Sequence, residues 1–390
     1  MNPTTPFWRD KRIKPILLQI IFVIIVGIFF FYFINNALSG LRRSGLSLSF
    51  GFLNSTASFD ISRDKLIDYT ATDSYSRAIL VGFLNTLRVA VLGIFFATII
   101  GVTLGIARLS NNWLARTTSL VYVEIFRNTP LLVQMIIWFS AVFLMLPLIE
   151  NSYIFAGNIY FSNRGIAVPW IQVTSMTWIW LSFVLVGIIM AVLVWKWKMK
   201  QQVETGIRKY PSLWVIGVIL ISFLLPMGIT QSGPFLLSMP EVHSNGRSFV
   251  GGFVISPSFG AVLIALVMYT SAFIAEIVRA GIMGVNKGQL EAAQSLGLKS
   301  STTLRLVIFP QAFRIIIPPV TSQYLNLTKN SSLAVAVGYP EIVSVGNTIL
   351  NQSGRAIQMI IIMIILYLTF SLITSLFMNI FNKYTQLVER

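Results

Sequence analysis

The most informative side chains of this 390-residue sequence lie in a polar segment, residues 284–312, between two long apolar stretches. Helix formers run up to Gly297, which fits the left-handed residue that ends many helices. Ser300 or Ser301 can then cap a second short helix, which should end before Pro310. Such a bent helix pair presents small and apolar side chains, and this shape suits insertion into a groove on another protein. An amphipathic loop lying on a membrane surface is the alternative interpretation.

Two acid–base pairs occur at helical spacing. Glu124 and Arg127 are three residues apart, and so are Glu276 and Arg279. Residues at this spacing share a helix face, so each couple can form an ion pair. For the second couple a structural salt bridge is the favoured interpretation, and a role in gating or in substrate contact is the alternative.

Polar side chains also interrupt two apolar stretches. Gln134 lies among apolar residues just after Pro130, which should rigidify or kink the chain. A polar group at this depth usually faces protein or a water-lined path, and an interhelical hydrogen bond explains Gln134 equally well. Residues 315–337 carry many hydrogen-bonding groups, and we expect Pro318–Pro319 to break this helix. Because such groups are costly against lipid, the helix should be interior or should line a cavity.

Composition decides which kind of protein positions these side chains. Hydrophobic residues make up 55% of the chain and charged residues only 11%, whereas soluble domains are roughly 25% charged. The chain is therefore expected to be an all-α polytopic membrane protein. With no cysteine and one histidine, we expect neither a metal site nor a cofactor. The net charge of +16 is better explained by basic cytoplasmic loops than by nucleic acid, which is not an expected partner.

Eight stretches approach the roughly 20 residues that a helix needs to cross a bilayer. They are residues 16–33, 86–106, 131–148 (beginning a few turns earlier), 178–195, 213–229, 259–280, 315–337 and 357–380. An even number puts both termini on one side. Most basic residues outside these stretches fall on that side, so the positive-inside rule places both termini in the cytoplasm. They include Arg9, Lys11, Arg12, Lys14, Lys196, Lys198, Lys200, Arg208, Lys209, Lys287, Lys299 and Arg305.

The segment 284–312 resembles the EAA motif of permease subunits of ATP-binding-cassette (ABC) importers, which reads E-A-A, three residues, G, nine residues, I-x-L-P. The matching positions hold Glu291, Ala292, Ala293, Gly297 and Pro310, with Val307 and Phe309 in place of Ile and Leu. Further stretches resemble the polar amino-acid uptake branch of this family, and the overall layout resembles its general L-amino acid permease type. These stretches are Lys287-Gly288-Gln289, Pro310-Gln311-Ala312, residues 126–134 and residues 275–282.

The resemblance implies a type I ABC-importer fold, with a MetI-like five-helix core and additional helices. It divides the chain into four parts. These are an N-terminal transmembrane helix with a periplasmic loop (1–77), the first part of the core (78–147), an insertion with two extra transmembrane helices (148–252) and the second part of the core with its cytoplasmic coupling loop (253–390). Scaffolding around the core is the only role we expect for the insertion.

The resemblance further implies a non-enzymatic subunit of a bacterial inner membrane. Its implied partners are a second, homologous permease, a cytoplasmic ABC ATPase dimer and a periplasmic amino-acid-binding protein. The ATPase would bind ATP, because this sequence has no phosphate-binding loop of its own. Closure of the ATPase is expected to pull on the helix Glu291–Gly297. The candidate contacts for an amino-acid zwitterion crossing the lipid bilayer are Gln134, Tyr269, Gln323 and Asn326.

Two other functions compete with this hypothesis. A gradient-driven secondary transporter or channel explains the intramembrane Glu276, Arg279 and Lys329 equally well, but it leaves the segment 284–312 without a purpose. A membrane-embedded enzyme is disfavoured by the lack of cysteine, by the single His243 outside the cytoplasm and by the absence of clustered carboxylates within the apolar stretches.

Overall fold

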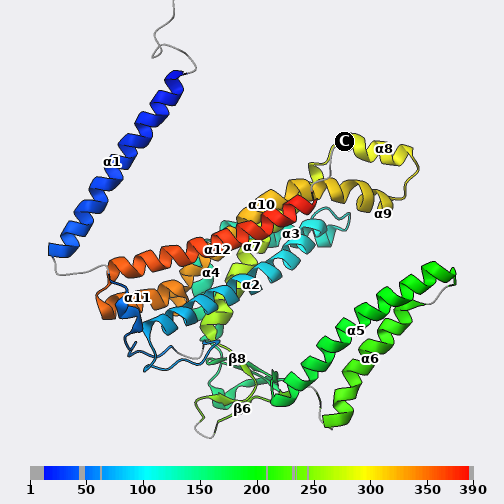
Figure 1. The fold of residues 1–390 in the computed structure, drawn as a ribbon, viewed down its shortest axis with the longest axis horizontal. Coiled ribbons are helices and arrows are strands. Elements are labelled where there is room, and N and C mark those ends of the chain that lie inside the picture. The colour runs from blue at the N-terminus through cyan, green and yellow to red at the C-terminus, as the bar shows by residue number, and fades with distance from the viewer. Residues whose placement is uncertain are drawn as a thin grey trace, which may run out of the picture.

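Long apolar helices account for most of the chain in the computed structural model (Figure 1). The structure describes residues 13–43, 49–61, 64–207, 210–230, 233, 235–243 and 246–385. Within these residues seven helices are long and apolar enough to cross a membrane, and a pair bent by 102° makes an eighth if it counts as one span. The seven contain α1 (Ile13–Arg43), α2 (Tyr75–Ala107), α5 (Ser175–Thr205), α6 (Pro211–Thr230), α7 (Pro257–Met283), α10 (Phe309–Asn330) and α12 (Ala356–Thr385).

Each of the eight apolar stretches predicted from the sequence coincides with one of these helices or with the bent pair. The polytopic helical fold class is therefore confirmed. Five of the basic residues used in the orientation argument lie outside the described residues, namely Arg9, Lys11, Arg12, Arg208 and Lys209.

A close contact between α2 and α7 forms the centre of the bundle. Small buried residues recur at every fourth position of α2, namely Gly93, Ala97, Gly101 and Gly105. A Cβ atom at Gly101 would lie 2.7 Å from the Ile274 side chain, and one at Gly105 would lie 2.7 Å from the Ala275 carbonyl oxygen. The two backbones therefore approach more closely than larger residues allow. In lipid, this kind of packing holds helices together without a hydrophobic driving force.

α10 belongs to an unbroken helical run that begins at the short helix α9 (Ser300–Thr303). A π-helical turn, η5 (Leu304–Ile308), joins α9 to α10 and leaves Pro310 in the first turn of α10. The prediction that the second short helix ends before Pro310 is therefore wrong. The first turn of a helix does not use the N–H group that proline lacks, so the helix continues through this residue.

The expected break at Pro318–Pro319 is also wrong. Both prolines lie inside α10, which packs against α7 and α12 along its length. Packing of this kind lets membrane helices tolerate the hydrogen bonds that proline removes. The run continues as a 3₁₀ segment, η6 (Ser331–Val337), and ends at Gly338, which has a φ of +69°.

At the end of the bundle where α2 begins, buried polar side chains hold neighbouring segments together. The Glu341 carboxylate caps α11 (Ile342–Ser353) by accepting hydrogen bonds from two backbone N–H groups, and it accepts a third, 2.8 Å long, from the Tyr367 hydroxyl of α12. The Asn85 amide of α2 donates to the backbone carbonyls of Asp64 (2.6 Å) and Pro340 (2.8 Å). These bonds fix the loop before α2 against the chain before α11.

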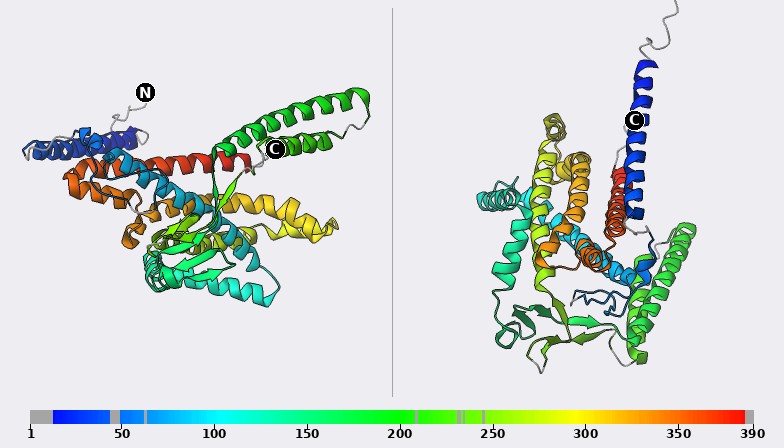
Figure 2. Two further views of the ribbon diagram at one scale, coloured as in Figure 1. Left: turned by 90° about the horizontal axis from the view of Figure 1, so that it is seen from below. Right: turned by 90° about the vertical axis from the view of Figure 1, so that its left-hand side faces the viewer.

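Residues 148–255 form small antiparallel sheets at the foot of the bundle, and the helical hairpin of α5 and α6 leads away from them (Figures 1 and 2). One sheet has the strand order β1-β2-β3-β8, and two further sheets pair β4 with β5 and β6 with β7. The strands are β1 (Tyr153–Phe155), β2 (Ile159–Ser162), β3 (Gly165–Val168), β4 (Trp170–Gln172), β5 (Leu236–Ser238), β6 (Glu241–Val242), β7 (Phe249–Val250) and β8 (Phe253–Ile255). These strands were not predicted from the sequence, because strands of two to four residues are too short to show an alternating pattern.

We expect the Gly101→Leu substitution to force α2 away from α7 and to lower the free energy of unfolding by about 1–3 kcal/mol, as overpacking does. Gly27→Leu in α1 is the matched control, since a Cβ atom there meets nothing within 4 Å. Thermal unfolding of the purified full-length protein in mild detergent measures both. Equal melting temperatures would contradict the close α2–α7 contact.

Candidate functional site

The segment 284–312 forms a helix, a glycine turn and a second helix, which project beyond the end of the bundle (Figure 1). The Asn286 side chain caps the first of these helices, α8 (Lys287–Ser295), by accepting a 2.8 Å hydrogen bond from the N–H of Gly288. Gly297 has a φ of +72°, so it adopts the left-handed conformation expected of it. The predicted helix–glycine–helix shape is confirmed.

The predicted serine cap of the second helix is wrong. Ser300 and Ser301 are the first residues of α9, and Lys299 precedes them without a side-chain capping bond. The turn after Gly297 is so short that the Lys299 carbonyl already accepts a hydrogen bond from the N–H of Thr303, 2.9 Å away. This bond draws both serines into the helix.

The loop turns part of its small and apolar surface outward. Within α8, Ala293 is buried, whereas Glu291 and Ala292 are exposed. Leu290 is 40% exposed and Leu296 is 78% exposed. A small apolar cluster supports the loop from beneath and consists of Val285, Ile308 and Ala312. The outward surface of α8 therefore offers apolar side chains for contact with another protein.

One of the two predicted ion pairs is present, and it has a third member. Nη2 of Arg279 lies 2.5 Å from Oε1 of Glu276, and Arg108, directly after α2, binds the same carboxylate. Because Glu276 and Arg279 belong to α7, Arg108 ties α2 to α7 at the end that carries the loop. Sequence reasoning missed this role, since a basic residue at the end of an apolar stretch looks like an ordinary cytoplasmic charge.

The other predicted pair, Glu124 with Arg127, does not form. The Glu124 carboxylate accepts a 3.0 Å hydrogen bond from the side-chain amide of Asn128, one turn further along the helix. The Arg127 guanidinium lies 5.9 Å from the centre of the Phe273 ring on α7. Glu124 thus pairs with an amide at the i+4 position, and Arg127 lies near an aromatic face.

Gln134 braces the 102° bend between α3 (Trp113–Asn128) and the helix that begins with α4 (Leu131–Ile136). Its Nε2 donates to the carbonyl oxygens of Phe126 (2.9 Å) and Thr129 (3.0 Å), where α3 ends and its carbonyls have no helical partner. Pro130 lies at the bend, and the kink predicted there is confirmed.

The four candidate path residues occupy different settings. Gln134 is buried at the bend, and Tyr269 is half-buried on α7, with its ring centre 4.9 Å from that of Phe273. Gln323 is half-buried and Asn326 is exposed, both on α10. In the described part of the chain, no hydrogen bond joins any two of these four. Their contact with a substrate therefore stays a prediction.

One face of α10 is polar and uncovered. Ser322, Asn326 and Lys329 recur at intervals of four and three residues, so they share a helix face, and all three are exposed. Elsewhere on the helix the polar groups are paired, as in the 2.7 Å hydrogen bond between the hydroxyls of Tyr324 and Thr98. Because polar side chains are costly against lipid, the uncovered face requires protein or water beside it.

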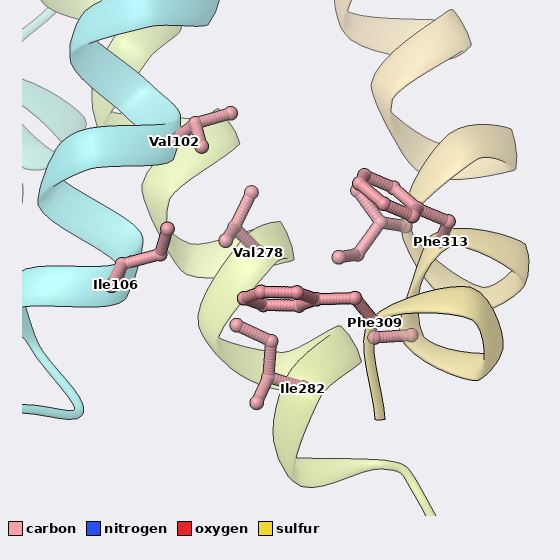
Figure 3. Close-up of a pocket in the computed structure, with 8 residues that line it drawn as sticks. Val102, Ile106, Val278, Ile282, Phe309 and Phe313 are labelled. Carbon is pink, nitrogen blue, oxygen red and sulfur yellow. The ribbon is translucent and has the colours of Figure 1, made fainter. Parts of the chain in front are cut away.

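An apolar cavity of about 220 Å³ lies between α2, α7 and α10 near the loop (Figure 3). Phe309 and Phe313 of α10 point into it toward Val278 and Ile282 of α7. Its lining consists entirely of apolar side chains and therefore offers a zwitterion no hydrogen bond. It marks a place where the start of α10 is loosely packed.

Comparisons with known proteins agree over almost the whole chain. The family model described as binding-protein-dependent transport system inner membrane component matches residues 184–386. The general L-amino acid transport system permease protein AapQ of Rhizobium johnstonii is 44% identical, with 98% of this chain and 94% of that protein covered. The putative amino-acid ABC transporter permease protein YhdX of Escherichia coli is 43% identical, with 100% and 96% covered. The glutamate/glutamine/aspartate/asparagine transport system permease protein BztB of Rhodobacter capsulatus is 37% identical, with 98% and 96% covered.

We expect Gln134→Leu to leave two carbonyl groups at the bend unpaired and to lower the free energy of unfolding by about 1–3 kcal/mol. Gln19→Leu, on an exposed position of α1, is the control with the same change of side chain. Melting temperatures of the two full-length variants in the same detergent provide the comparison. An unchanged melting temperature for Gln134→Leu would show that the brace contributes nothing.

Proposed function

Because the chain belongs to the family of binding-protein-dependent transport system inner membrane components, we propose that it is the permease subunit of an ATP-driven importer of L-amino acids. It is a multi-pass inner membrane protein and a transport component rather than an enzyme. The names of AapQ, YhdX and BztB all refer to amino-acid transport, which supports an amino acid as the substrate.

The loop 284–312 couples this subunit to a separate cytoplasmic ATPase dimer, and the projecting turn at Gly297 is the observation that carries the proposal. α8 and α9 stand clear of the bundle, with Glu291, Ala292 and Leu296 exposed, which is the shape that enters a groove on a partner. With the loop on the cytoplasmic side, both termini of the chain are also cytoplasmic. The end of α5 that follows Lys196–Lys200 lies toward the same end of the molecule as the loop (Figure 1) and supports this orientation.

The polar face of α10 meets a second, homologous permease, and the substrate passes between the two subunits. The exposed Ser322, Asn326 and Lys329 would then border protein and water instead of lipid. Gln323 is on α10 and Tyr269 is on α7, which packs against α10, and both are candidate contacts for the passing substrate. A periplasmic amino-acid-binding protein delivers the substrate at the end of the bundle opposite the loop.

We expect Gly297→Asp to abolish ATP-dependent uptake and to leave membrane insertion intact. A Cβ atom at Gly297 meets nothing within 4 Å, so the new side chain obstructs only a partner, and the backbone strain is about 1–2 kcal/mol. Radiolabelled amino-acid uptake in cells, with membrane levels followed by immunoblot, measures the effect. Glu291→Ala should lower uptake in the same way.

Gly206→Asp is the matched control for Gly297→Asp. Gly206 ends α5 with a φ of +67°, and its Cβ position is equally open. Loss of uptake in both variants, or in neither, would refute the coupling role.

Uptake by the unaltered protein should stop when ATP is depleted and persist when the proton gradient is collapsed, which a gradient-driven transporter would not do.

The chain has no cysteine, so a single introduced thiol reports on one position. We expect a membrane-impermeant thiol reagent to label Asn326→Cys in the assembled transporter. It should not label Leu372→Cys, a 61% exposed position on α12 that faces lipid in this arrangement. Equal labelling of the two variants, or labelling of the α12 position alone, would contradict a water-filled path along α10.

A further inference from the structure

A pocket of about 400 Å³ with charged residues in its wall lies at the end of the bundle opposite the coupling loop. It is enclosed by the loop before α2, the turn between β2 and β3, the start of α7 and the end of η6. α7 has 27 residues, so about 40 Å of helix separates this pocket from the loop. Its size is within the range of about 300–1,000 Å³ typical of small-molecule sites.

Asp64 places a buried carboxylate in the pocket wall, and the residue is only 4% exposed. Its Oδ2 accepts hydrogen bonds from the hydroxyls of Ser256 (2.5 Å) and Ser258 (3.4 Å). In the described part of the chain, Oδ1 accepts none, and no basic group lies within ion-pair distance. Arg88 is the nearby cation, but its guanidinium lies over the Phe259 ring, 3.7 Å from the ring centre.

A carboxylate buried in this way favours a cation from outside the chain. Burial raises the pKa of Asp64, which the two serine hydroxyls and the charge of Arg88 offset only in part. An unpaired buried charge is costly, and a ligand ammonium would supply the missing partner. The position is fixed in advance, since the Asp64 backbone carbonyl is held by the Asn85 amide.

The turn between β2 and β3 supplies two further groups. Ser162 pairs with Gly165, so Asn163 and Arg164 are the two turn residues, and both line the pocket. Oδ1 of Asn163 is buried and has no hydrogen-bond partner among the described residues, so it is a second acceptor for an ammonium group. The exposed Arg164 guanidinium makes no ion pair with the described residues and carries the opposite charge.

The pocket therefore presents acceptors and a donor of opposite charge to one small volume. Its remaining walls include apolar side chains, namely Phe139, Leu144 and Val337. A free anion would meet Asp64, and a simple cation would meet Arg164. A molecule that carries both charges satisfies both groups, and an arginine guanidinium matches the two oxygens of a carboxylate.

We propose that this pocket binds the α-ammonium and α-carboxylate of an amino acid at the outer mouth of the transporter, with Asp64 holding the ammonium and Arg164 the carboxylate. The proposal rests on the function proposed above and adds a site to it. It recognises the two groups that all α-amino acids share. The substrate side chain would lie against the apolar walls, so the site admits amino acids of different kinds.

The test measures binding of tritiated L-alanine to the full-length transporter complex in nanodiscs, without the binding protein and without ATP. We expect saturable binding, which Asp64→Asn and Arg164→Gln each weaken about tenfold or more. Propionate lacks the ammonium group and ethylamine lacks the carboxylate, so neither should compete at concentrations where unlabelled alanine does. Asp60→Asn, an exposed carboxylate of the same loop, should bind alanine as the unaltered protein does.

Melting temperatures show whether either substitution weakens binding only because it disturbs the fold. Asp64→Asn removes a buried charge and Arg164→Gln changes an exposed side chain, so both variants should unfold at or above the temperature of the unaltered protein. Unchanged alanine binding by both variants, or full competition by propionate or ethylamine alone, would overturn the proposal. If those results came with ATP-dependent uptake intact, only the mouth site would fail. Absence of ATP-dependent uptake by the unaltered complex would instead refute the proposed function.

Discussion

The contact between α2 and α7 fixes the position of both ends of the molecule that we connect with function. Gly101 and Gly105 let the two backbones approach until a single added carbon would clash, and Arg108 clamps the same pair of helices through Glu276. One end of α7 leads directly into the coupling loop, and its other end carries the serines that hold Asp64. The same pair of helices therefore connects the loop with the mouth pocket.

A bilayer offers no water to polar groups, so polar groups without a partner in the chain mark surfaces where another molecule can supply one. Gln134 satisfies carbonyls at a bend, and Glu341 satisfies N–H groups at a helix start. The exposed polar face of α10 and the buried, unpaired Oδ1 of Asn163 in the mouth pocket are two places where the described residues supply no such partner. They lie where a subunit of a larger transporter would meet another chain or its substrate, which agrees with membership of a family of transport components.

Sequence reasoning succeeded where one local rule dominates. Hydrophobic length predicted the membrane helices, and the left-handed preference of glycine predicted the turn at Gly297. It failed where tertiary packing overrides local preference. Pro318–Pro319 do not break α10, because neighbouring helices support it, and Arg127 pairs with an aromatic ring on another helix that sequence spacing could not reveal. The roles of Arg108 and Asp64 depend on contacts across 168 and 192 residues of chain, for which a single sequence contains no signal.

The continuous helical run from Ser300 to Val337 joins the two ends of the subunit through a single element. Its 38 residues span roughly 55 Å, from the coupling loop to the wall of the mouth pocket. Pro318 and Pro319 lie inside this run without ending it. Over this length, a tilt of about 5° about the pocket end would displace the loop end by about 5 Å, and the cavity beside Phe309 leaves space at that end. A single helical run of this length would thus connect a small movement at one surface of the membrane with the other surface.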